Sequence, residues 1–257
     1  ILWNNRFQFF DRTLLMLYYR MLGRGVVFTA HNVNAGKRDL NDNFLNRLSL
    51  RIQYRLPQHI FVHTARMKAE LAEEFSVPPE KVSVIHLGIN NTVPTSDMTS
   101  AEAKRRLGIG ESEKTLLFFG RISPYKGVDY VIGAMAKLCK TEANFRLIIV
   151  GSLQNCSDYW RQVQETVSRH GLKERILERI EFVPDEQAEV YFKAADALVL
   201  PYTEVYQSGV LILAYSFGLP VIASDVGSFR EDVVEGTTGH IFRPKDVSDL
   251  ARAIEQY

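Results

Sequence analysis

The sequence has little cysteine and almost no excess of charge. Its two cysteines, Cys139 and Cys156, form no Cys-x-x-Cys pair, so a disulfide framework is not expected and a reducing, cytoplasmic compartment fits best. The six histidines do not fall into ligand pairs with these cysteines, which argues against zinc. The formal net charge of +1 argues against a broad nucleic-acid-binding face, so no nucleic-acid partner is expected.

Long apolar runs are also absent. The opening segment ILWNNRFQFFDRTLLMLYYRMLGRG is rich in apolar and aromatic residues, but Arg6, Asp11, Arg12 and Arg20 interrupt it. No run therefore reaches the ~20 apolar residues that a membrane span needs. Two interpretations stay open: an amphipathic helix that covers a sheet, or a helix whose aromatic and basic face contacts the inner surface of a membrane.

The composition itself is that of a globular protein. Hydrophobic residues make up 46% and charged residues 24% of 257 residues, a length that suits one large or two ordinary domains. The sequence begins with Ile inside an apolar run and ends inside a helical pattern, so we expect a fragment cut at both ends.

Short apolar segments alternate with longer amphipathic segments such as 128–140 and 185–196. This alternation predicts an α/β fold, in which helices cover both faces of parallel sheets. We expect strands at residues 26–30, 59–64, 81–88, 115–120, 146–151, 180–183, 197–202, 220–225 and 240–242. The polar segment 90–100 breaks the alternation and divides the chain into a first domain, residues 1–93, and a second, residues 94–257.

Two residues indicate where predicted helices end or begin. His170, which precedes a glycine, is typical of a helix C-terminus. Ser228 followed three residues later by Glu231 predicts a capping box at the start of a short helix.

The segment GRISPYKG, residues 120–127, follows one predicted strand and precedes a predicted helix. Ligands of open parallel sheets bind at such carboxyl ends of strands. Gly120 permits close approach of the backbone, and the turn at Pro124 lets Arg121 and Lys126 project into one space. A guanidinium and an ammonium suit a diphosphate; the alternative is a pair of solvated surface cations.

A second candidate anion site begins at the Ser-Gly pair in YQSGVLILAY. Ser208 can cap the apolar helix that follows, and Gly209 leaves the next amides exposed. Free N–H groups and the helix dipole attract phosphate, although an ordinary N-cap also explains Ser208. Two such arrangements, each at the carboxyl end of a strand, together favour phosphate binding.

These motifs carry a resemblance to a known family. Two segments of the chain resemble the nucleotide-sugar-binding domain of GT-B glycosyltransferases of the retaining family 4. They are FFGRISPYKGVDYVIGAMAKL and AADALVLPYTEVYQSGVLILAYSFGLPVIASDVGSFREDVVEGTTGHIF. Three earlier segments look like the later half of that fold's acceptor domain: VVFTAHNV, HIFVHTARMKAEL and KVSVIHLGIN. The resemblance implies two Rossmann-like doubly wound domains, with the N-terminal one truncated.

The resemblance also implies roles for single residues. Arg121 and Lys126 would bind the donor's diphosphate next to Gly120. The helix-start amides of Ser208, Gly209 and Val210 would hold its distal phosphate.

Three further positions match the family more loosely. Gly151 would lie in a loop that lines the nucleotide, and the backbone of Val183 would read the nucleobase. His31 would reach the transferred sugar, although without the family it is better explained as a structural residue or a helix cap. His63 and Thr64 could line the cleft between the domains.

The function implied is transfer of a hexose from a nucleotide diphosphate sugar to a glycan or lipid-linked acceptor, with retention of configuration, in cell-surface polysaccharide or glycolipid synthesis. Arg121, Lys126 and the amides would stabilise the charge on the leaving diphosphate, and His31 would orient the sugar. No cofactor is expected. The sequence has no Asp-x-Asp motif, which suits a fold whose members usually need no metal.

The sequence departs from the family at the start of the same helix. Relatives commonly carry two glutamates there, and the second binds the ribose hydroxyls; Val205 and Leu213 occupy these positions. Glu204 lies one residue from the first position and could substitute if the loop shifts. The missing carboxylates leave open a non-catalytic nucleotide-sugar-binding module or a degenerate transferase, and an epimerase of the same fold is a further alternative.

Overall fold

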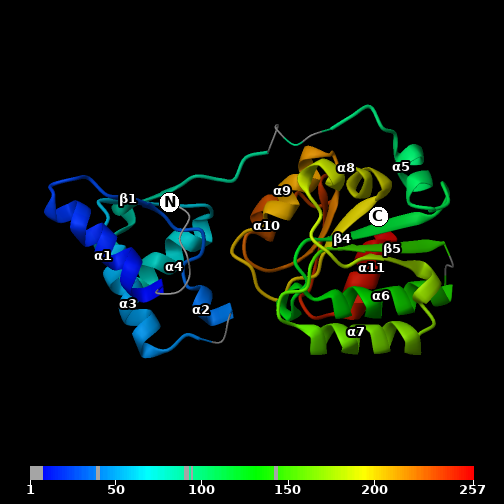
Figure 1. Cartoon of the computed structure of the whole chain (residues 1–257), viewed down its shortest axis with the longest axis horizontal. Coiled ribbons are helices and arrows are strands. Elements are labelled where there is room, and N and C mark those ends of the chain that lie inside the picture. Colours follow the sequence, from blue (N-terminus) through cyan, green and yellow to red (C-terminus); the bar gives the residue numbers. More distant parts are fainter. Residues whose placement is uncertain (1–7, 39–40, 90–92, 94, 142–143) are drawn as a thin grey trace. The chain divides into compact units, whose positions relative to one another are not determined.

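The structure is a computed structural model that describes residues 8–38, 41–89, 93, 95–141 and 144–257. The chain divides into two compact units, Ile1–Leu87 and Gly88–Tyr257, each with its own sheet (Figure 1). Every strand pair that the structure describes is parallel, so the predicted α/β class is confirmed. Residues 1–7 of the opening segment, and 90–92 and 94 of the predicted linker, lie outside the described residues.

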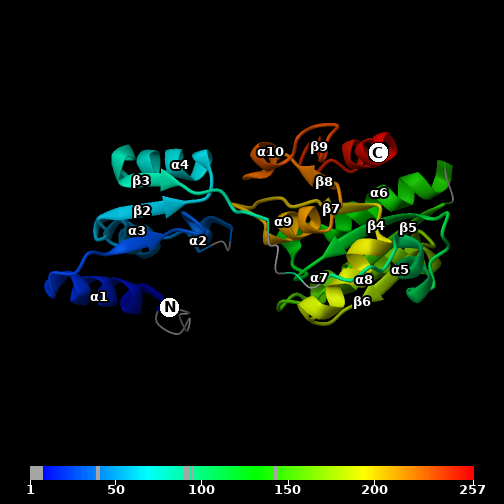
Figure 2. The same cartoon turned by 90° about the horizontal axis from the view of Figure 1, so that it is seen from above.

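The first unit contains a three-stranded sheet in the order β1-β2-β3. Its strands are β1 (Val27–Thr29), β2 (His59–Val62) and β3 (Val82–Val84). Its helices are α1 (Gln8–Met21), α2 (Ala35–Arg38), α3 (Phe44–Arg55), α4 (Ala65–Phe75) and the 3₁₀ turn η2 (Pro79–Lys81). Helix α1 packs on α3, and α4 packs on β2 and β3 (Figure 2). In the part of the chain that the structure describes, no helix is both long and apolar enough to cross a bilayer.

The second unit contains a six-stranded sheet in the order β6-β5-β4-β7-β8-β9. The strands are β4 (Lys114–Phe119), β5 (Phe145–Val150), β6 (Ile176–Arg179), β7 (Ala197–Leu200), β8 (Val221–Ser224) and β9 (Gly239–Phe242). The helices are α5 (Ser100–Arg106), α6 (Val128–Thr141), α7 (Ser157–Arg169), α8 (Asp185–Ala194), α9 (Gly209–Ser216), α10 (Phe229–Asp232), α11 (Val247–Gln256) and the 3₁₀ turns η3 (Pro124–Lys126) and η4 (Lys173–Arg175).

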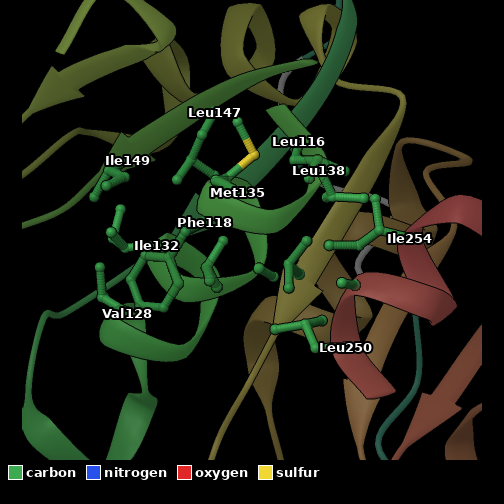
Figure 3. Packing of buried hydrophobic residues seen from close by; sticks show 14 of the residues in the cluster. Leu116, Phe118, Val128, Ile132, Met135, Leu138, Leu147, Ile149, Leu250 and Ile254 are labelled. Carbon is green, nitrogen blue, oxygen red and sulfur yellow. The ribbon is translucent and has the colours of Figure 1, made fainter. Parts of the chain in front are cut away.

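Both faces of this sheet are covered, which explains why its strands are almost continuously apolar. On one face, Phe118 packs in a cluster with Ile132 of α6 and Leu250 of α11 (Figure 3). On the other face, Leu117 packs in a second cluster with Leu211 of α9. Successive side chains of β4 therefore alternate between two buried cores.

The order of the strands places a switch point between β4 and β7. From β4 the chain continues to β5 and then β6 on one side, whereas β7, β8 and β9 follow on the other side. Ligands of doubly wound sheets bind in the crevice at the carboxyl ends of the strands, where this reversal occurs. Both predicted phosphate motifs begin here, because residues 120–127 follow β4 and residues 201–209 follow β7.

One predicted strand was wrong. Residues 180–183 form a loop, and the strand is β6, Ile176–Arg179, which pairs with β5. Strand β6 lies at the edge of the sheet, where Glu178 and Arg179 are exposed, so its apolar content does not distinguish it from the loop. In that loop, Phe182 is exposed and Val183 is buried.

The two helix-end predictions had opposite outcomes. His170 is the C-cap of α7 and is followed by Gly171 with φ +65°, as predicted. The capping box at Ser228 was wrong, because its side chain makes no capping hydrogen bond. Ser228 has helical dihedrals, φ −82° and ψ −11°, whereas an N-cap is extended. The N–H of Glu231 instead donates to the carbonyl of Ser228 at 2.8 Å.

Candidate functional site

The loops at the carboxyl ends of β4, β5 and β7 are hydrogen-bonded to one another. The N–H of Ile122 donates to the carbonyl of Ser152 at 2.8 Å, which joins the loops after β4 and β5. The N–H of Thr203 donates to the carbonyl of Tyr125 at 2.8 Å, which joins the loops after β4 and β7. Backbone hydrogen bonds thus hold three loops as one rim at the switch point.

Gly120 brings the two predicted phosphate motifs together. A methyl group on Gly120 would lie 3.4 Å from Nζ of Lys126 and 3.4 Å from Cγ2 of Val210. The ammonium of the first motif and the helix start of the second therefore lie beside the same short stretch of backbone. Gly120 has φ +110°, a conformation that favours glycine.

Lys126 and Arg121 differ in their surroundings. Lys126 ends η3, and its Nζ donates to the hydroxyl of Tyr202 at 3.0 Å and lies 4.8 Å from the centre of that ring. Arg121 is exposed, and no hydrogen bond or ion pair to another described residue occupies its guanidinium. One cation is therefore held in place by the fold, and the other is available to an anion.

The start of α9 has the predicted cap. Ser208 is buried, and its Oγ accepts a hydrogen bond from the N–H of Leu211 at 3.4 Å, so the N-cap is confirmed. No hydrogen bond between described residues uses the N–H of Gly209 or of Val210. Two backbone donors and the positive end of the helix dipole thus face away from the fold.

Nothing in the fold requires glycine at position 209. Gly209 is not among the residues with positive φ, and a methyl group on it would meet no atom within 4 Å. A methyl group at position 209 would therefore not disturb the fold.

The structure places Val183 and Gly151 on loops that follow β6 and β5. The side chain of Val183 is buried in the core, so only its backbone can face a ligand. No hydrogen bond between described residues uses its N–H or C=O. Gly151 packs on the backbone of Gly120, with φ +149°. The nucleotide contacts of both residues stay predictions.

Apolar side chains occupy the two positions where the family resemblance predicts glutamates. Val205 and Leu213 are half-buried and pack against the apolar cluster under α9. Next to Glu204, the backbone of Val205 packs closely on Gly227, because a methyl group on Gly227 would lie only 1.8 Å from the carbonyl oxygen of Val205. The described loop therefore presents no carboxylate from either position.

In the first unit, the structure brings His31 and His63 together. Nδ1 of His63 lies 2.9 Å from the carbonyl oxygen of Ile85, and its Nε2 lies 3.1 Å from Nδ1 of His31. A carbonyl only accepts, so Nδ1 of His63 carries a proton, and in the neutral ring its Nε2 accepts from His31. Burial and the neighbouring His63 lower the pKa of His31, which favours its neutral form.

Thr64 has a structural role. Its Oγ1 accepts a hydrogen bond from the N–H of Met67 at 3.0 Å and caps α4. This capping role was not apparent from the sequence.

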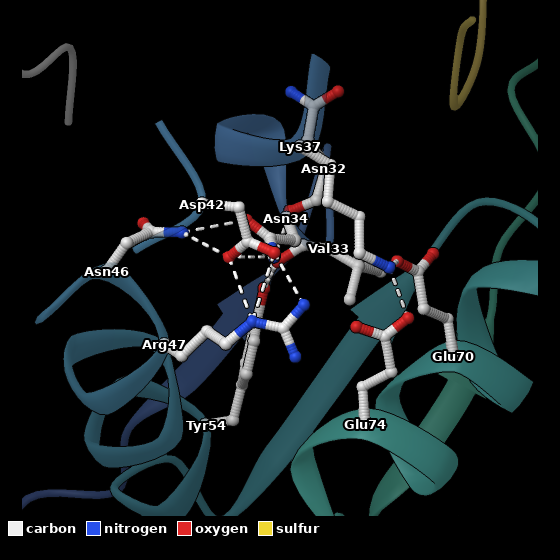
Figure 4. Close-up of polar contacts among 10 residues, drawn as sticks. All are labelled: Asn32, Val33, Asn34, Lys37, Asp42, Asn46, Arg47, Tyr54, Glu70 and Glu74. Atoms are coloured by element: carbon white, nitrogen blue, oxygen red, sulfur yellow. Dashed lines mark hydrogen bonds and ion pairs between the residues drawn. The ribbon is translucent and has the colours of Figure 1, made fainter. Parts of the chain in front are cut away.

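A polar network fixes the loop that follows His31. Asp42 accepts hydrogen bonds from Asn34 at 2.9 Å and from Asn46 at 3.2 Å, and Arg47 binds it with Nε and Nη2 (Figure 4). Sequence reasoning missed this network, because Asn34 and Asp42 lie in a segment without periodicity.

The same loop is tied to two helices. The hydroxyl of the buried Tyr54, on α3, donates to the carbonyl of Val33 at 2.6 Å. Lys37 forms ion pairs with Glu70 and Glu74 of α4 (Figure 4). These contacts join the loop after β1 to α3 and α4, and they hold the backbone next to His31 in place.

This network predicts a dependence of stability on pH. The hydrogen bonds from Arg47 lower the pKa of Asp42 from 3.8 to about 2. A lowered pKa in the folded state stabilises it above pH 3.8, and this contribution is lost as the pH falls towards 2. We expect the Asp42→Asn variant to unfold more easily than the wild type at pH 6, and the difference to shrink at pH 2.5, in urea titrations followed by circular dichroism.

The matched control is Asp158→Asn, which removes an exposed carboxylate paired with Arg161. Exposed pairs of this kind contribute little, so its unfolding midpoint should follow the wild type at both pH values. A midpoint for Asp42→Asn that also equals the wild type at pH 6 would contradict the stabilising role of the network.

Comparison with known proteins gives the family. Residues 113–257 match the family model described as glycosyl transferases group 1. The chain belongs to this family. Residues 8–93 match the model described as Glycosyltransferase Family 4.

Relatives in the family include the D-inositol 3-phosphate glycosyltransferase of Corynebacterium aurimucosum, 28% identical over 242 residues, which are 90% of this chain and 57% of that protein. An uncharacterized glycosyltransferase of Methanocaldococcus jannaschii is 30% identical over 195 residues, 74% of this chain and 48% of that protein. The chain thus spans about half the length of the curated relatives that it matches.

Solved structures share the fold. Anabaena Alr3699/HepE in complex with UDP has a TM-score of 0.84 at 20% identity, with coverage of 95% of this chain and 65% of that chain. Sucrose-phosphate synthase from Thermosynechococcus elongatus has a TM-score of 0.79 at 22% identity, with coverage of 95% and 62%. These likenesses confirm the predicted GT-B class.

Proposed function

We propose that the second unit binds the donor of a retaining hexosyltransferase, which moves a hexose from a nucleotide diphosphate sugar to the hydroxyl of a glycan or lipid-linked acceptor. The observation that carries the proposal is that Lys126 and Val210, the second residue of α9, both lie beside Gly120, at the switch point of the sheet. With Arg121, which follows Gly120 in sequence, the second unit would offer a diphosphate two cations and the N–H groups of Gly209 and Val210, which match its charge and acceptors.

The proposed chemistry is stabilisation of a leaving group. As the glycosidic bond breaks, negative charge grows on the distal phosphate, where Lys126, Arg121 and the amides of Gly209 and Val210 would neutralise it. The departing phosphate would take the proton of the attacking acceptor hydroxyl on the same face of the sugar. Nε2 of His31 would orient the sugar as a hydrogen-bond acceptor. The proposal assigns all charge neutralisation to the protein and requires no cofactor or metal ion.

A uridine nucleotide is the first donor to test. Alr3699/HepE has been crystallised with UDP and with UDP-glucose, and it has the fold of this chain. The likeness supports a nucleotide sugar as the class of donor. A binding screen with uridine, guanosine and adenosine nucleotides would identify the nucleotide.

The acceptor side of the proposal rests on α1. Exposed apolar side chains gather on this helix and just after it: Leu14, Leu17, Tyr18, Tyr19, Met21 and Leu22. Arg20 and Arg24 lie among them in sequence, and this mixture is typical of helices that lie on anionic membranes. We propose peripheral contact with the inner face of a membrane, which suits synthesis of a glycolipid or a surface polysaccharide.

The test of donor binding uses Gly209→Ala. Because the fold has room for a methyl group there, we expect unchanged thermal stability but about tenfold weaker binding of the nucleotide sugar, measured by calorimetry with UDP-glucose, GDP-mannose and ADP-glucose. The control is Gly88→Ala, which also meets no atom within 4 Å but lies outside the rim. If the wild type binds none of the donors, the proposed function is wrong.

A second candidate function is a module that binds the nucleotide sugar without transferring it. Leu213 favours this candidate, because an apolar side chain at this position cannot bind ribose hydroxyls. Hydrolysis of the bound donor, followed by release of nucleoside diphosphate, separates the two. Turnover supports the transferase, and tight binding with no turnover supports the module.

A further inference from the structure

His63 is a buried histidine at the carboxyl edge of the first sheet, and the proposed reaction gives it no role. The parallel register of β1 and β2 pairs Thr29 with Phe61. Continued along both strands, this register places His31 opposite His63, and the register of β2 and β3 places Ile85 on the other side of His63. Three adjacent strands thus bring two imidazole rings and a backbone carbonyl together, at the edge where open parallel sheets bind ligands.

The two hydrogen bonds of His63 use one donor and one acceptor. Its Nδ1 lies 2.9 Å from the carbonyl oxygen of Ile85, which can only accept, so Nδ1 of His63 carries a proton. Its Nε2 lies 3.1 Å from Nδ1 of His31. A neutral imidazole has one donor and one acceptor, so both contacts are satisfied without a charge on His63 when His31 donates from Nδ1.

The hydrogen bond to His63 determines which tautomer of His31 is stabilised. A neutral histidine carries its proton on either ring nitrogen, and in water the form protonated at Nε2 is the more abundant. The contact with His63 favours the other form, because it requires the proton at Nδ1 of His31. In this tautomer Nε2 of His31, on an exposed residue, is a hydrogen-bond acceptor. Burial and the neighbouring His63 lower the pKa of His31, which agrees with a neutral ring.

We propose that His63 is a positioning residue, which holds His31 in the tautomer protonated at Nδ1 and so makes Nε2 an acceptor for a hydroxyl of the transferred sugar. The role toward the sugar rests on the proposed function, whereas the tautomer of His31 is a property of the first unit alone. An acceptor at Nε2 orients a sugar by one of its O–H groups, whereas a donor there would select a sugar oxygen instead. The parallel pairing of β1 and β2 keeps the two rings in reach of each other.

The first test measures the tautomer directly. Nitrogen-15 NMR of the 257-residue chain distinguishes protonated from unprotonated ring nitrogens, and the six histidines can be assigned by single substitutions. At a pH where both rings are neutral, we expect His31 of the wild type to be protonated at Nδ1. In His63→Phe, which keeps a ring but no acceptor, the proton should move to Nε2 of His31. His63→Gln keeps an acceptor oxygen, so this variant should retain the wild-type tautomer.

The second test measures release of nucleoside diphosphate from the donor chosen by calorimetry. We expect His63→Phe to lower turnover by about tenfold, which corresponds to the loss of one hydrogen bond between neutral groups. His63→Gln should keep turnover within about threefold of the wild type, because the tautomer is retained. Recovery by Gln separates positioning of His31 from a general effect on packing.

The matched control is His59→Phe, on the same strand. Nε2 of His59 lies 2.9 Å from Oγ of Ser83 on β3. This variant therefore also loses a side-chain hydrogen bond across the first sheet, and a general loss of stability would appear in both variants. The tautomer of His31 and the turnover should stay as in the wild type.

The outcomes separate the inference from the proposed function. A wild-type His31 protonated at Nε2, or the same tautomer in the wild type and in His63→Phe, would overturn the inference and leave the proposed function standing. Unchanged turnover in His63→Phe, despite a changed tautomer, would overturn the positioning role in the same way. A wild type that binds none of the donors would overturn the proposed function, and with it the role toward the sugar, whatever the tautomer.

Discussion

Replacing Lys126 by Ala should reduce turnover of the nucleotide sugar by ~10²-fold or more, because one preorganised contact to the charge that develops on a leaving group has this magnitude. The ammonium lies beside Gly120 and the start of α9 and is held by Tyr202. The measurement is release of nucleoside diphosphate from the donor chosen by calorimetry. Arg121→Ala should have a comparable effect, with a larger share in donor affinity, because its exposed side chain must become ordered on binding.

The control for charge alone is Lys137→Ala, on α6. Lys137 is hydrogen-bonded to Ser248 and lies outside the three-loop rim, so removing it changes the net charge equally without touching the site. Its turnover should stay within about twofold of the wild type. Turnover that survives in both Lys126→Ala and Arg121→Ala would refute the assignment of the phosphate site.

Much of the second unit could be predicted, because its signals are local. Strands buried on both faces are apolar along their whole length, so the segments at β4, β5, β7 and β8 were visible in the sequence. The cap of Ser208 is also local, since it joins residues one helical turn apart. The edge strand β6 has exposed, charged residues and so a weaker apolar pattern. The strand was therefore predicted at residues 180–183, whereas it lies at Ile176–Arg179.

The arrangement of the site could not be predicted, because it depends on contacts between distant segments. Lys126 and Tyr202 lie 76 positions apart, and their hydrogen bond exists because β4 and β7 are neighbours in the sheet. The apolar pattern of the sequence does not predict the order of the strands in the sheet either. The pairing of His31 with His63 likewise follows from the parallel pairing of β1 and β2.

A second large effect is expected from Gly151→Ala, which should lower the free energy of unfolding by about 3 kcal/mol. Gly151 has φ +149°, and a methyl group on it would lie 1.8 Å from the carbonyl oxygen of Gly120. Backbone cannot swing away as a side chain can, so the loops after β4 and β5 must separate. This separation would strain the hydrogen bond from the N–H of Ile122 to the carbonyl of Ser152.

The measurement is urea unfolding followed by the fluorescence of Trp160, which packs on the core of the second unit, in a Trp3→Phe background. Gly88→Ala is the control, because a methyl group there meets no atom within 4 Å and its midpoint should equal that of the wild type. Gly151→Ala should also weaken nucleotide binding, since Gly120 is the backbone beside Lys126. A Gly151→Ala midpoint equal to that of the control would show that the rim tolerates separation, and the site would then not depend on this close approach.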